Sequence, residues 1–270
     1  MRLPKPFFRL PVSFDVERLV AEVSTLPASA WVPHPNEIEG NSSVRLISAE
    51  GAENDDVSGR MLVTPHLAAA PYVRQVLASF GVVWSRSRLM RLAPGAVVPL
   101  HADINYQWYS RVRLHIPVQT HPDVAFYCGD ERVHMAAGEA WLFDNWRLHR
   151  VENPSHVERI HLVADTSGTA PFWRLAAQSD TPMAQWHQHR FNPALDAQLM
   201  TENNVPPAIM PAAEVQLLLR DLGAELTTVD NSDAARSVVH QYQMLLEDFC
   251  HDWRQLCAMH GLRGNGLADF

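Results

Sequence analysis

The central part of the chain reads as a succession of short strands. Between Val82 and Asp165, β-branched and aromatic runs alternate with turn residues such as Pro94-Gly95 and Gly138-Glu139, and helical periodicity is nearly absent. Strands this short, roughly ten residues apart, favour an antiparallel sandwich or a jelly roll, because a parallel sheet would need a helix after each strand. The runs that predict strands are Val82–Leu92, Val97–His101, Val112–Val118, Val124–Tyr127, Arg132–Met135, Ala140–Phe143, His149–Val151 and Ile160–Ala164. We therefore expect a mainly β fold with a jelly-roll core.

Helical spacing of apolar residues flanks this β region on both sides. On the N-terminal side it predicts a helix between Phe14 and Val23, after a strand at Phe7–Leu10, and an amphipathic helix over Ala68–Phe80. On the C-terminal side one apolar stripe runs from Val215 to Leu222, and a longer one from Val238 to Leu256. Flanking helices therefore accompany the predicted jelly roll.

The change of pattern predicts two domains. We expect residues 1–175 to form the jelly-roll domain with N-terminal α/β elements, and residues 176–270 to form a C-terminal helical extension. Neither helical stripe keeps a strict heptad over several turns, which favours helices that pack on each other or on the β core over a coiled-coil partner site. The extension is expected to cap the pocket or to form a homodimer through the C-terminal helices.

Composition narrows the class of protein. The 270 residues are 47% hydrophobic and 19% charged, a balance typical of globular proteins and not of disordered ones. With 22 Lys and Arg against 30 Asp and Glu, the net charge of −8 argues against a general nucleic-acid binder. No apolar run approaches the ~18 residues of a membrane span, and the three cysteines lack the spacing of a disulfide framework. We expect a cytoplasmic protein with neither nucleic-acid nor membrane partners.

A candidate metal site stands at the ends of the predicted strands. Side chains two residues apart on a strand point the same way, so His101 and Asp103 can bind one ion. A jelly roll brings distant strands face to face, and His149 begins a later strand. Two histidines and one carboxylate form the facial triad of non-haem Fe(II) oxygenases, which leaves positions open for cosubstrate and O₂. Because the chain has 14 histidines, a core or surface role is the commoner explanation for any single one.

Arg159 raises the odds of the oxygenase interpretation. It follows His149 by ten residues, and a hairpin at Asn153-Pro154 would return it to the neighbourhood of the metal. A guanidinium buried in a β core needs an anionic partner. A dicarboxylate that chelates iron at one end and meets Arg159 at the other would be such a partner.

The stretch from Leu89 to Asp165 resembles the aspartyl/asparaginyl β-hydroxylase family of Fe(II)- and 2-oxoglutarate-dependent dioxygenases, which includes proline cis-hydroxylase-like bacterial enzymes. The segments that carry the resemblance, in order, are Pro94-Gly95, His101-Ala-Asp103, Arg113-Leu-His115, Gly138-Glu139-Ala-Trp141-Leu-Phe-Asp144, His149-Arg-Val-Glu-Asn153 and Arg159-Ile-His-Leu-Val-Ala-Asp165. Some peptide-hydroxylating members lack the carboxylate that Asp103 provides, and its presence leans toward the bacterial branch.

The resemblance implies a double-stranded β-helix fold and assigns roles to six residues. His101, Asp103 and His149 would hold Fe(II), and Arg159 would bind the distal carboxylate of 2-oxoglutarate. Arg113 and His115 would form a second polar pair near the cosubstrate, although Arg113 could instead pair with Asp144 or Asp165 in the sheet. The implied activity is hydroxylation of an unactivated carbon of an amino acid or of a peptide Asp/Asn-type substrate, with O₂ as the oxidant.

An alternative function uses the same fold without oxygen chemistry. A cupin-like protein could hold a metal or a sugar in a similar barrel, because such folds host many functions. Arg159 distinguishes the two interpretations, since a 2-oxoglutarate site needs it and a simple metal cupin does not.

Overall fold

The chain folds into two compact units. The computed structural model describes all residues except 34, 36–37, 105, 205–206, 229, 231, 265, 267 and 269–270. Contacts group the chain into Met1–Asn204, which we call the β unit, and Val205–Phe270, which we call the helical hairpin. The domain boundary expected after residue 175 stays a prediction. Contacts group residues 176–204 with the β unit.

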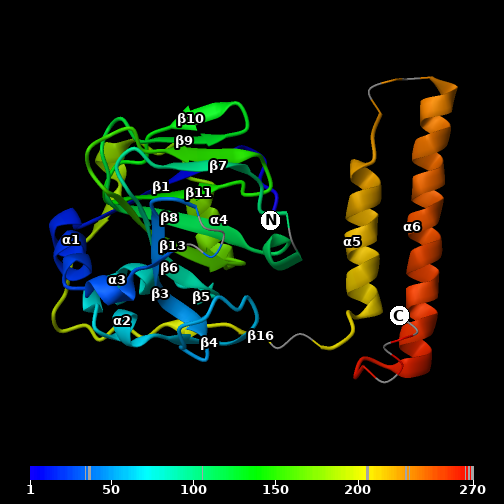
Figure 1. Ribbon diagram of the computed structural model, residues 1–270, viewed down its shortest axis with the longest axis horizontal. Helices are drawn as coiled ribbons and strands as arrows, with labels where there is room; N and C mark the ends of the chain where they lie inside the picture. The colour runs from blue at the N-terminus through cyan, green and yellow to red at the C-terminus, as the bar shows by residue number, and fades with distance from the viewer. Residues whose placement is uncertain are drawn as a thin grey trace. The chain divides into compact units, whose positions relative to one another are not determined.

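A ten-stranded sheet forms the larger layer of the β unit (Figure 1). Its strands, in spatial order, are β14 (His187–His189), β1 (Phe7–Phe14), β11 (Glu139–Phe143), β8 (Val112–Gln119), β13 (Arg159–Thr166), β6 (Ser87–Leu92), β3 (Asn41–Ala49), β4 (Gly59–Val63) and β16 (Asn203–Asn204), with β2 (Val32–Pro33) paired to β3. Pairing from β1 to β4 is antiparallel throughout, and β14 joins β1 in parallel.

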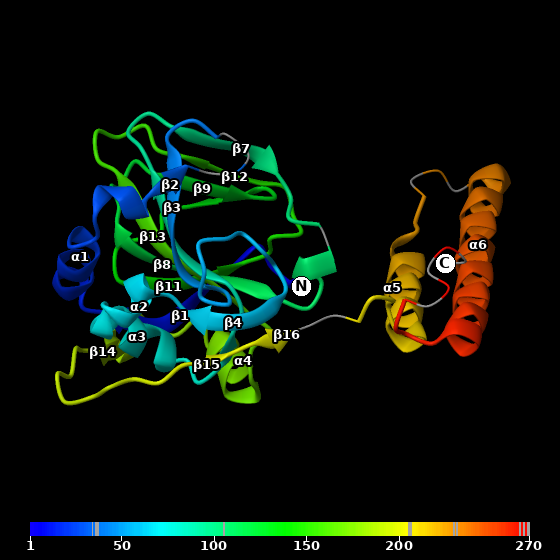
Figure 2. The same ribbon diagram turned by 60° about the horizontal axis from the view of Figure 1, so that its bottom comes forward.

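A four-stranded sheet lies over the first one as a second layer (Figures 1 and 2). Its order is β10 (Glu131–Val133), β9 (Ala125–Cys128), β12 (His149–Glu152) and β7 (Val97–His101). A separate parallel pair joins β5 (Val83–Trp84) to β15 (Met200–Thr201). Two facing antiparallel sheets confirm the expected mainly β, jelly-roll architecture with flanking helices.

Side chains alternate along the strands, so apolar residues face the main core and polar residues face the space between the two sheets. On β8, Val112, Leu114 and Ile116 belong to the main hydrophobic core, on the helix-covered side of the larger sheet. Their neighbours Arg113 and His115 point to the opposite face, into the space between the two sheets. A second, smaller core lines that space. It contains Phe7, Leu92, Val124, Phe126, Cys128, Met135, Trp141, Phe143 and Val151. The period of two in the sequence is therefore what delivers polar side chains to the intersheet space.

Short helices cover the outer side of the larger sheet. They are α1 (Val16–Ser24), α2 (Pro65–Ala68), α3 (Pro71–Ala78) and α4 (Ala170–Ala176), with 3-10 turns at Ala28–Ala30, Tyr106–Trp108 and Met183–Gln185. The expected single helix over Ala68–Phe80 is wrong at its start, because Pro71 begins α3 and its ring has no N–H for an interior helix bond. Beyond these helices the chain returns to this sheet, where β14 pairs with the end of β1 in parallel.

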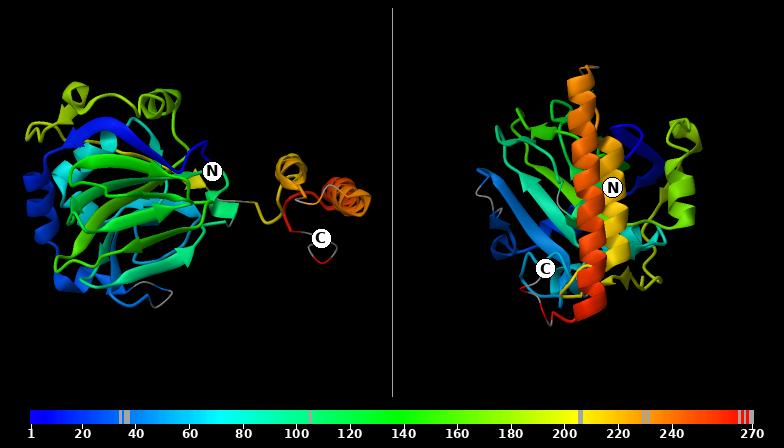
Figure 3. Two further views of the ribbon diagram at one scale, coloured as in Figure 1. Left: turned by 90° about the horizontal axis from the view of Figure 1, so that it is seen from above. Right: turned by 90° about the vertical axis from the view of Figure 1, so that its right-hand side faces the viewer.

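The helical hairpin contains α5 (Ala212–Glu225) and α6 (Asp233–His260), which pack against each other (Figure 3). The stripe expected to end at Gly223 continues two residues further, and the glycine lies opposite Leu246 of α6. Among the described residues, no helix is long and apolar enough to cross a membrane.

Candidate active site

The three predicted metal ligands meet between adjacent strands. His101 ends β7 and His149 begins β12, and the two are register partners in the smaller sheet. Asp103 follows two residues after His101, on the loop that leaves β7. One ligand atom from each of the three side chains lies within 4.8 Å of the other two, a spacing that fits a single metal ion. The residues with the chemistry of a facial triad are therefore brought together.

Backbone carbonyls orient both histidine rings. The Nδ1 atom of His101 lies 2.8 Å from the carbonyl oxygen of Pro99, and that of His149 lies 2.9 Å from the carbonyl oxygen of Arg147. This pairing places the proton on Nδ1 and leaves each Nε2 lone pair for a metal. Burial lowers the pKa of His149 to about 4, so its ring is neutral at physiological pH, as a ligand must be.

Asp144 supports the site indirectly. Its buried carboxylate accepts hydrogen bonds from the Trp146 N–H and from the Arg147 guanidinium, at 3.1 and 3.0 Å. It therefore shapes the turn that presents the Arg147 carbonyl to His149.

Arg113 lies between two carboxylates. It donates to Asp103 Oδ2 at 2.8 Å and to Asp165 Oδ1 at 2.9 Å, and its guanidinium stacks over the Trp108 ring at 4.3 Å. Burial acts to lower the pKa of Arg113, but Asp165 and Asp103 together outweigh it and raise the pKa above its ordinary value. Of the two pairings open from sequence, the structure selects Asp165 and adds Asp103. A permanently charged Arg113 thus holds a candidate ligand in place.

Arg159 is a buried cation without a carboxylate. It is 4% exposed, and among the described residues no Asp or Glu lies within ion-pair distance of it. One of its nitrogens lies 2.9 Å from Nδ1 of His161, while its Nε has no hydrogen-bond partner within the described part of the chain. Burial lowers the pKa of Arg159 to about 9, a sign that its charge is not compensated by the protein.

Two buried histidines adjoin Arg159. Nδ1 of His115 lies 3.3 Å from Nδ1 of His161, and each ring has an Nε2 with no partner among the residues described. Burial, followed by the charge of Arg159, holds the pKa of both histidines well below the ordinary value. His161 was absent from the sequence prediction. The sequence could have indicated this residue, because His161 lies two residues after Arg159 on β13 and the two side chains therefore share one face of the strand.

All six predicted residues line one cavity of about 380 Å³ between the sheets. Sequence analysis missed two further cations there, Arg86 and Arg88, which precede and lie within β6 with the same alternation. Arg88 is 2.8 Å from Asp55 Oδ1, an ion pair by distance, yet its Nε has no hydrogen-bond partner among the described residues. Burial, followed by repulsion from Arg86, lowers the pKa of Arg88 to about 10.

Comparison with known proteins finds a family model that matches this region of the chain. Residues 56–168 match the family model described as aspartyl/asparaginyl beta-hydroxylase, which confirms the resemblance predicted from sequence. The chain is 26% identical over 167 residues to an L-proline cis-4-hydroxylase of Rhizobium meliloti, covering 59% of this chain and 60% of that protein. It is 25% identical over 183 residues to L-proline cis-3-hydroxylase 1 of a Streptomyces species, covering 63% and 62%. The matches thus span less than two thirds of either relative.

Among solved structures, the chain resembles a prolyl-4-hydroxylase of Pseudomonas putida with a TM-score of 0.40 and 15% identity, over 62% of this chain and 95% of that one. It also resembles an oxidoreductase of the 2OG-Fe(II) oxygenase family from Burkholderia pseudomallei with a TM-score of 0.41 and 15% identity, over 58% and 80%.

Proposed function

We propose, on the premise that residues 56–168 match the aspartyl/asparaginyl β-hydroxylase family, that this chain is an Fe(II)- and 2-oxoglutarate-dependent dioxygenase. Its substrate is a small molecule with a carboxylate, of the amino-acid class, hydroxylated at an unactivated carbon. The curated relatives are named as proline hydroxylases, which supports an amino-acid substrate over a protein side chain. The expectation that two chains associate through the C-terminal helices stays a prediction.

Arg159 is the observation that carries the proposal. A buried guanidinium without a counter-ion costs folding free energy unless a ligand supplies the missing anion. It lines the same cavity as the His101, Asp103 and His149 cluster, where a simple metal-binding barrel has no use for it. A dicarboxylate that reaches from the metal to Arg159 would provide oxygen ligands at one end of the cavity and an anionic partner for the guanidinium at the other.

The donors present suit the implied groups. Two neutral imidazoles and a carboxylate match Fe(II), and the unpartnered nitrogens of Arg159 and His115 match an anion. When bound, iron and 2-oxoglutarate would together supply the electrons that activate O₂, the oxidant, for hydroxylation of an unreactive carbon.

The remaining work of the protein is placement and exclusion of water. Arg113 fixes the carboxylate of Asp103, and the backbone carbonyls fix both histidine rings. The rings of Phe126 and Phe143 pack around His149, with Phe143 at a centroid distance of 4.9 Å, and keep this wall of the cavity apolar. The His115 ring, neutral because of its lowered pKa, can donate one hydrogen bond to an anion without adding charge.

Charge balance in the cavity supports a substrate with one carboxylate. The charged lining comprises four arginines, at positions 86, 88, 113 and 159, and three aspartates, at positions 55, 103 and 165, which leaves one excess positive charge. A divalent metal adds two positive charges and the 2-oxoglutarate dianion offsets them. One positive charge then remains for the substrate, and Arg86 and Arg88 are the cations not used by the cosubstrate or by Asp103. We assign the substrate carboxylate to this pair.

The test is an amino-acid screen with purified protein, Fe(II) and 2-oxoglutarate, reading succinate and hydroxylated product together. We expect coupled turnover with free L-proline or another small amino acid, and loss of coupling when its carboxylate is amidated. If Fe(II) binds but 2-oxoglutarate yields no succinate with any substrate, the cupin-like alternative replaces this proposal.

A further inference from the structure

The helical hairpin exposes an unusual amount of apolar side chain. None of the 28 residues of α6 is buried, and Val215 is the one buried residue of α5 among those described. Tyr242, Leu245 and Phe249 are 56%, 60% and 48% exposed. Two helices packed only on each other cannot cover such a face, and monomeric proteins rarely leave one in water.

Most exposed apolar residues of α6 follow the spacing of a packed helical seam, in which positions recur at alternating steps of four and three residues. Val238, Tyr242, Leu245, Phe249 and Met259 are exposed members of this stripe, whereas the exposed Met244 lies off it. The polar Asp252 and the half-buried Leu256 occupy the two remaining positions. This is the a and d pattern of a coiled coil, sustained over three heptads with one polar member. The longer apolar stripe expected from the sequence also contained Leu246 and Trp253 and so kept no strict heptad, whereas the exposed fractions single out this overlapping stripe, which does.

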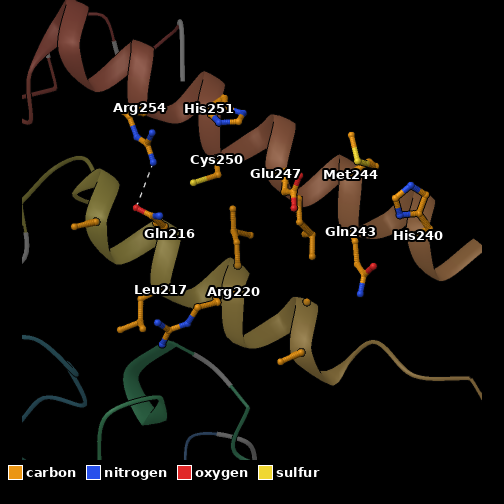
Figure 4. Close-up of a pocket in the computed structure, with 15 residues that line it drawn as sticks. Gln216, Leu217, Arg220, His240, Gln243, Met244, Glu247, Cys250, His251 and Arg254 are labelled. Carbon is orange, nitrogen blue, oxygen red and sulfur yellow. Dashed lines mark hydrogen bonds between the residues drawn. The ribbon is translucent and has the colours of Figure 1, made fainter.

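A groove of about 940 Å³ lies between α5 and α6 (Figure 4). Its lining is mixed: Leu219, Met244 and Leu246 contribute apolar surface, and Gln243, Glu247 and Arg254 of α6 contribute polar groups. Arg254 donates to the Gln216 side chain of α5 there, at 3.3 Å. The three polar residues of α6 lie roughly a third to half a turn around the helix from the stripe, at 100° per residue. The stripe is therefore separate from the side of α6 that packs against α5.

We propose that this apolar side binds the same side of a second copy of the chain, with the two α6 helices antiparallel. In the matching a-to-d register, Phe249 packs on Leu245 of the partner subunit and Leu256 packs on the partner's Val238. The dimer axis then crosses α6 near Glu247. This inference rests on the hairpin alone and is independent of the proposed enzymatic activity.

Asp252 selects the antiparallel arrangement. It is the polar member of the stripe, and a parallel dimer would place it against Asp252 of the partner subunit, two like charges at one level of the seam. The antiparallel register places it opposite the partner's Tyr242, whose hydroxyl can donate to the carboxylate. Neither side chain has a hydrogen-bond partner among the described residues. A single polar pair in an apolar seam is a common means of fixing orientation.

The second helix fits the same bundle. Gly223 of α5 lies opposite Leu246, one residue from the level of the proposed axis, and its neighbour Leu222 is 49% exposed. In the proposed dimer this exposed leucine is available to extend the apolar contact from α6 onto α5. The exposed side chains of the stripe, together with Leu222, offer roughly 600 Å² per copy, close to the ~800 Å² per partner of a stable interface.

The experiment uses the full chain and light scattering after gel filtration, at several concentrations. We expect twice the 30.4 kDa mass of one chain. Leu245→Glu is expected to raise the dimer dissociation constant on the order of 100-fold, because each dimer then buries two charges at the seam. Met244→Glu is the matched control: Met244 is the adjacent residue, 44% exposed, and lines the groove between α5 and α6, off the stripe, so its substitution is expected to leave the mass unchanged.

A distance measurement tests the register without disrupting the seam. A spin label at Val238→Cys, in a chain with Cys250→Ser and Cys257→Ser, reports the separation of the two labels. The antiparallel register predicts roughly 27 Å along the axis, from a rise of 1.5 Å per residue, whereas a parallel pair predicts labels at the same level, about 10 Å apart across the seam. A monomer at every concentration, equal effects of the two glutamate variants, or the short distance would each overturn the proposal.

Discussion

Replacing Arg159 by methionine separates cosubstrate binding from stability. In the wild-type cavity the guanidinium would form charge-assisted bonds to a carboxylate, which contribute about 1.5–3 kcal/mol. Its loss should therefore weaken 2-oxoglutarate binding by about 10- to 150-fold. Iron affinity should change little, because Arg159 contacts none of the three candidate ligands. Arg159→Lys should recover only part of the loss, since an ammonium lacks the planar fork of donors.

The same substitution should not destabilise the ligand-free protein. Arg159 has no carboxylate partner among the described residues, and burial lowers its pKa to about 9, so its charge opposes folding in the absence of a ligand. A methionine of similar length removes that cost and loses only the bond to His161. We expect the apo Tm of the variant to equal or exceed that of the wild type, whereas a given concentration of 2-oxoglutarate should raise the Tm of the wild type more than that of the variant.

The assay is an anaerobic titration of Fe(II)-loaded protein with 2-oxoglutarate, followed by the weak visible charge-transfer band and, in parallel, by thermal unfolding. Arg91→Met is the matched control, because Arg91 lies on β6 beside Ile160 but points to the outer side, toward Glu158 at 3.7 Å. An unchanged 2-oxoglutarate affinity in the Arg159 variant would refute the assignment. A large fall of its apo Tm would instead mean that an internal partner compensates the charge.

Three further predictions follow from the site. His101→Ala and His149→Ala should each abolish measurable Fe(II) binding by isothermal titration while circular dichroism stays unchanged, and full Fe(II) affinity in either variant would remove that residue from the metal site. Arg113→Met frees Asp103 to rotate and should lower Fe(II) affinity by about 10- to 100-fold, whereas Arg9→Met, on the exposed edge near Glu139, should not. The buried histidines 115, 149 and 161 have lowered pKa values in the folded state, so the unfolded chain binds more protons below its ordinary pKa of about 6.5. The contribution of these neutral histidines to the stability of the metal-free protein is therefore complete above that pH and is lost as the pH falls below it, by about 2 kcal/mol for His149 between pH 7 and pH 5; urea unfolding at the two pH values measures it, and a pH-independent midpoint would contradict the buried, neutral state.

Local patterns determined most of the β core and the candidate ligands. Each predicted strand between Val97 and Ala164 corresponds to a strand of the structure within a few residues, because alternation of apolar and polar positions is a property of the strand itself. His101 and Asp103 could be paired because they lie two residues apart, although the strand ends at His101 and Asp103 lies on the loop that follows. Their link to His149 depended on spacing alone, and the register between β7 and β12 now provides it.

Only the tertiary structure decided which polar residues share the intersheet space. Arg86, Arg88 and His161 sit in runs that look like ordinary strand sequence, and nothing local indicates that their faces converge on Arg159 and His115. The two-carboxylate contact of Arg113 likewise requires β8 to lie beside β13 and opposite the loop after β7.

The clearest division lies in the C-terminal region. Helical periodicity in the sequence determined that α5 and α6 form, since a 3.6-residue repeat needs no distant partner. The sequence could not tell which apolar residues of α6 stay uncovered. An apolar stripe through Leu246 and one through Leu245 differ by one position, and only packing against α5 distinguishes them. Similarly, strands within residues 187–204 pair with β1, β4 and β5, which lie far from them in the sequence. Strand propensity is a local property and cannot specify such partners.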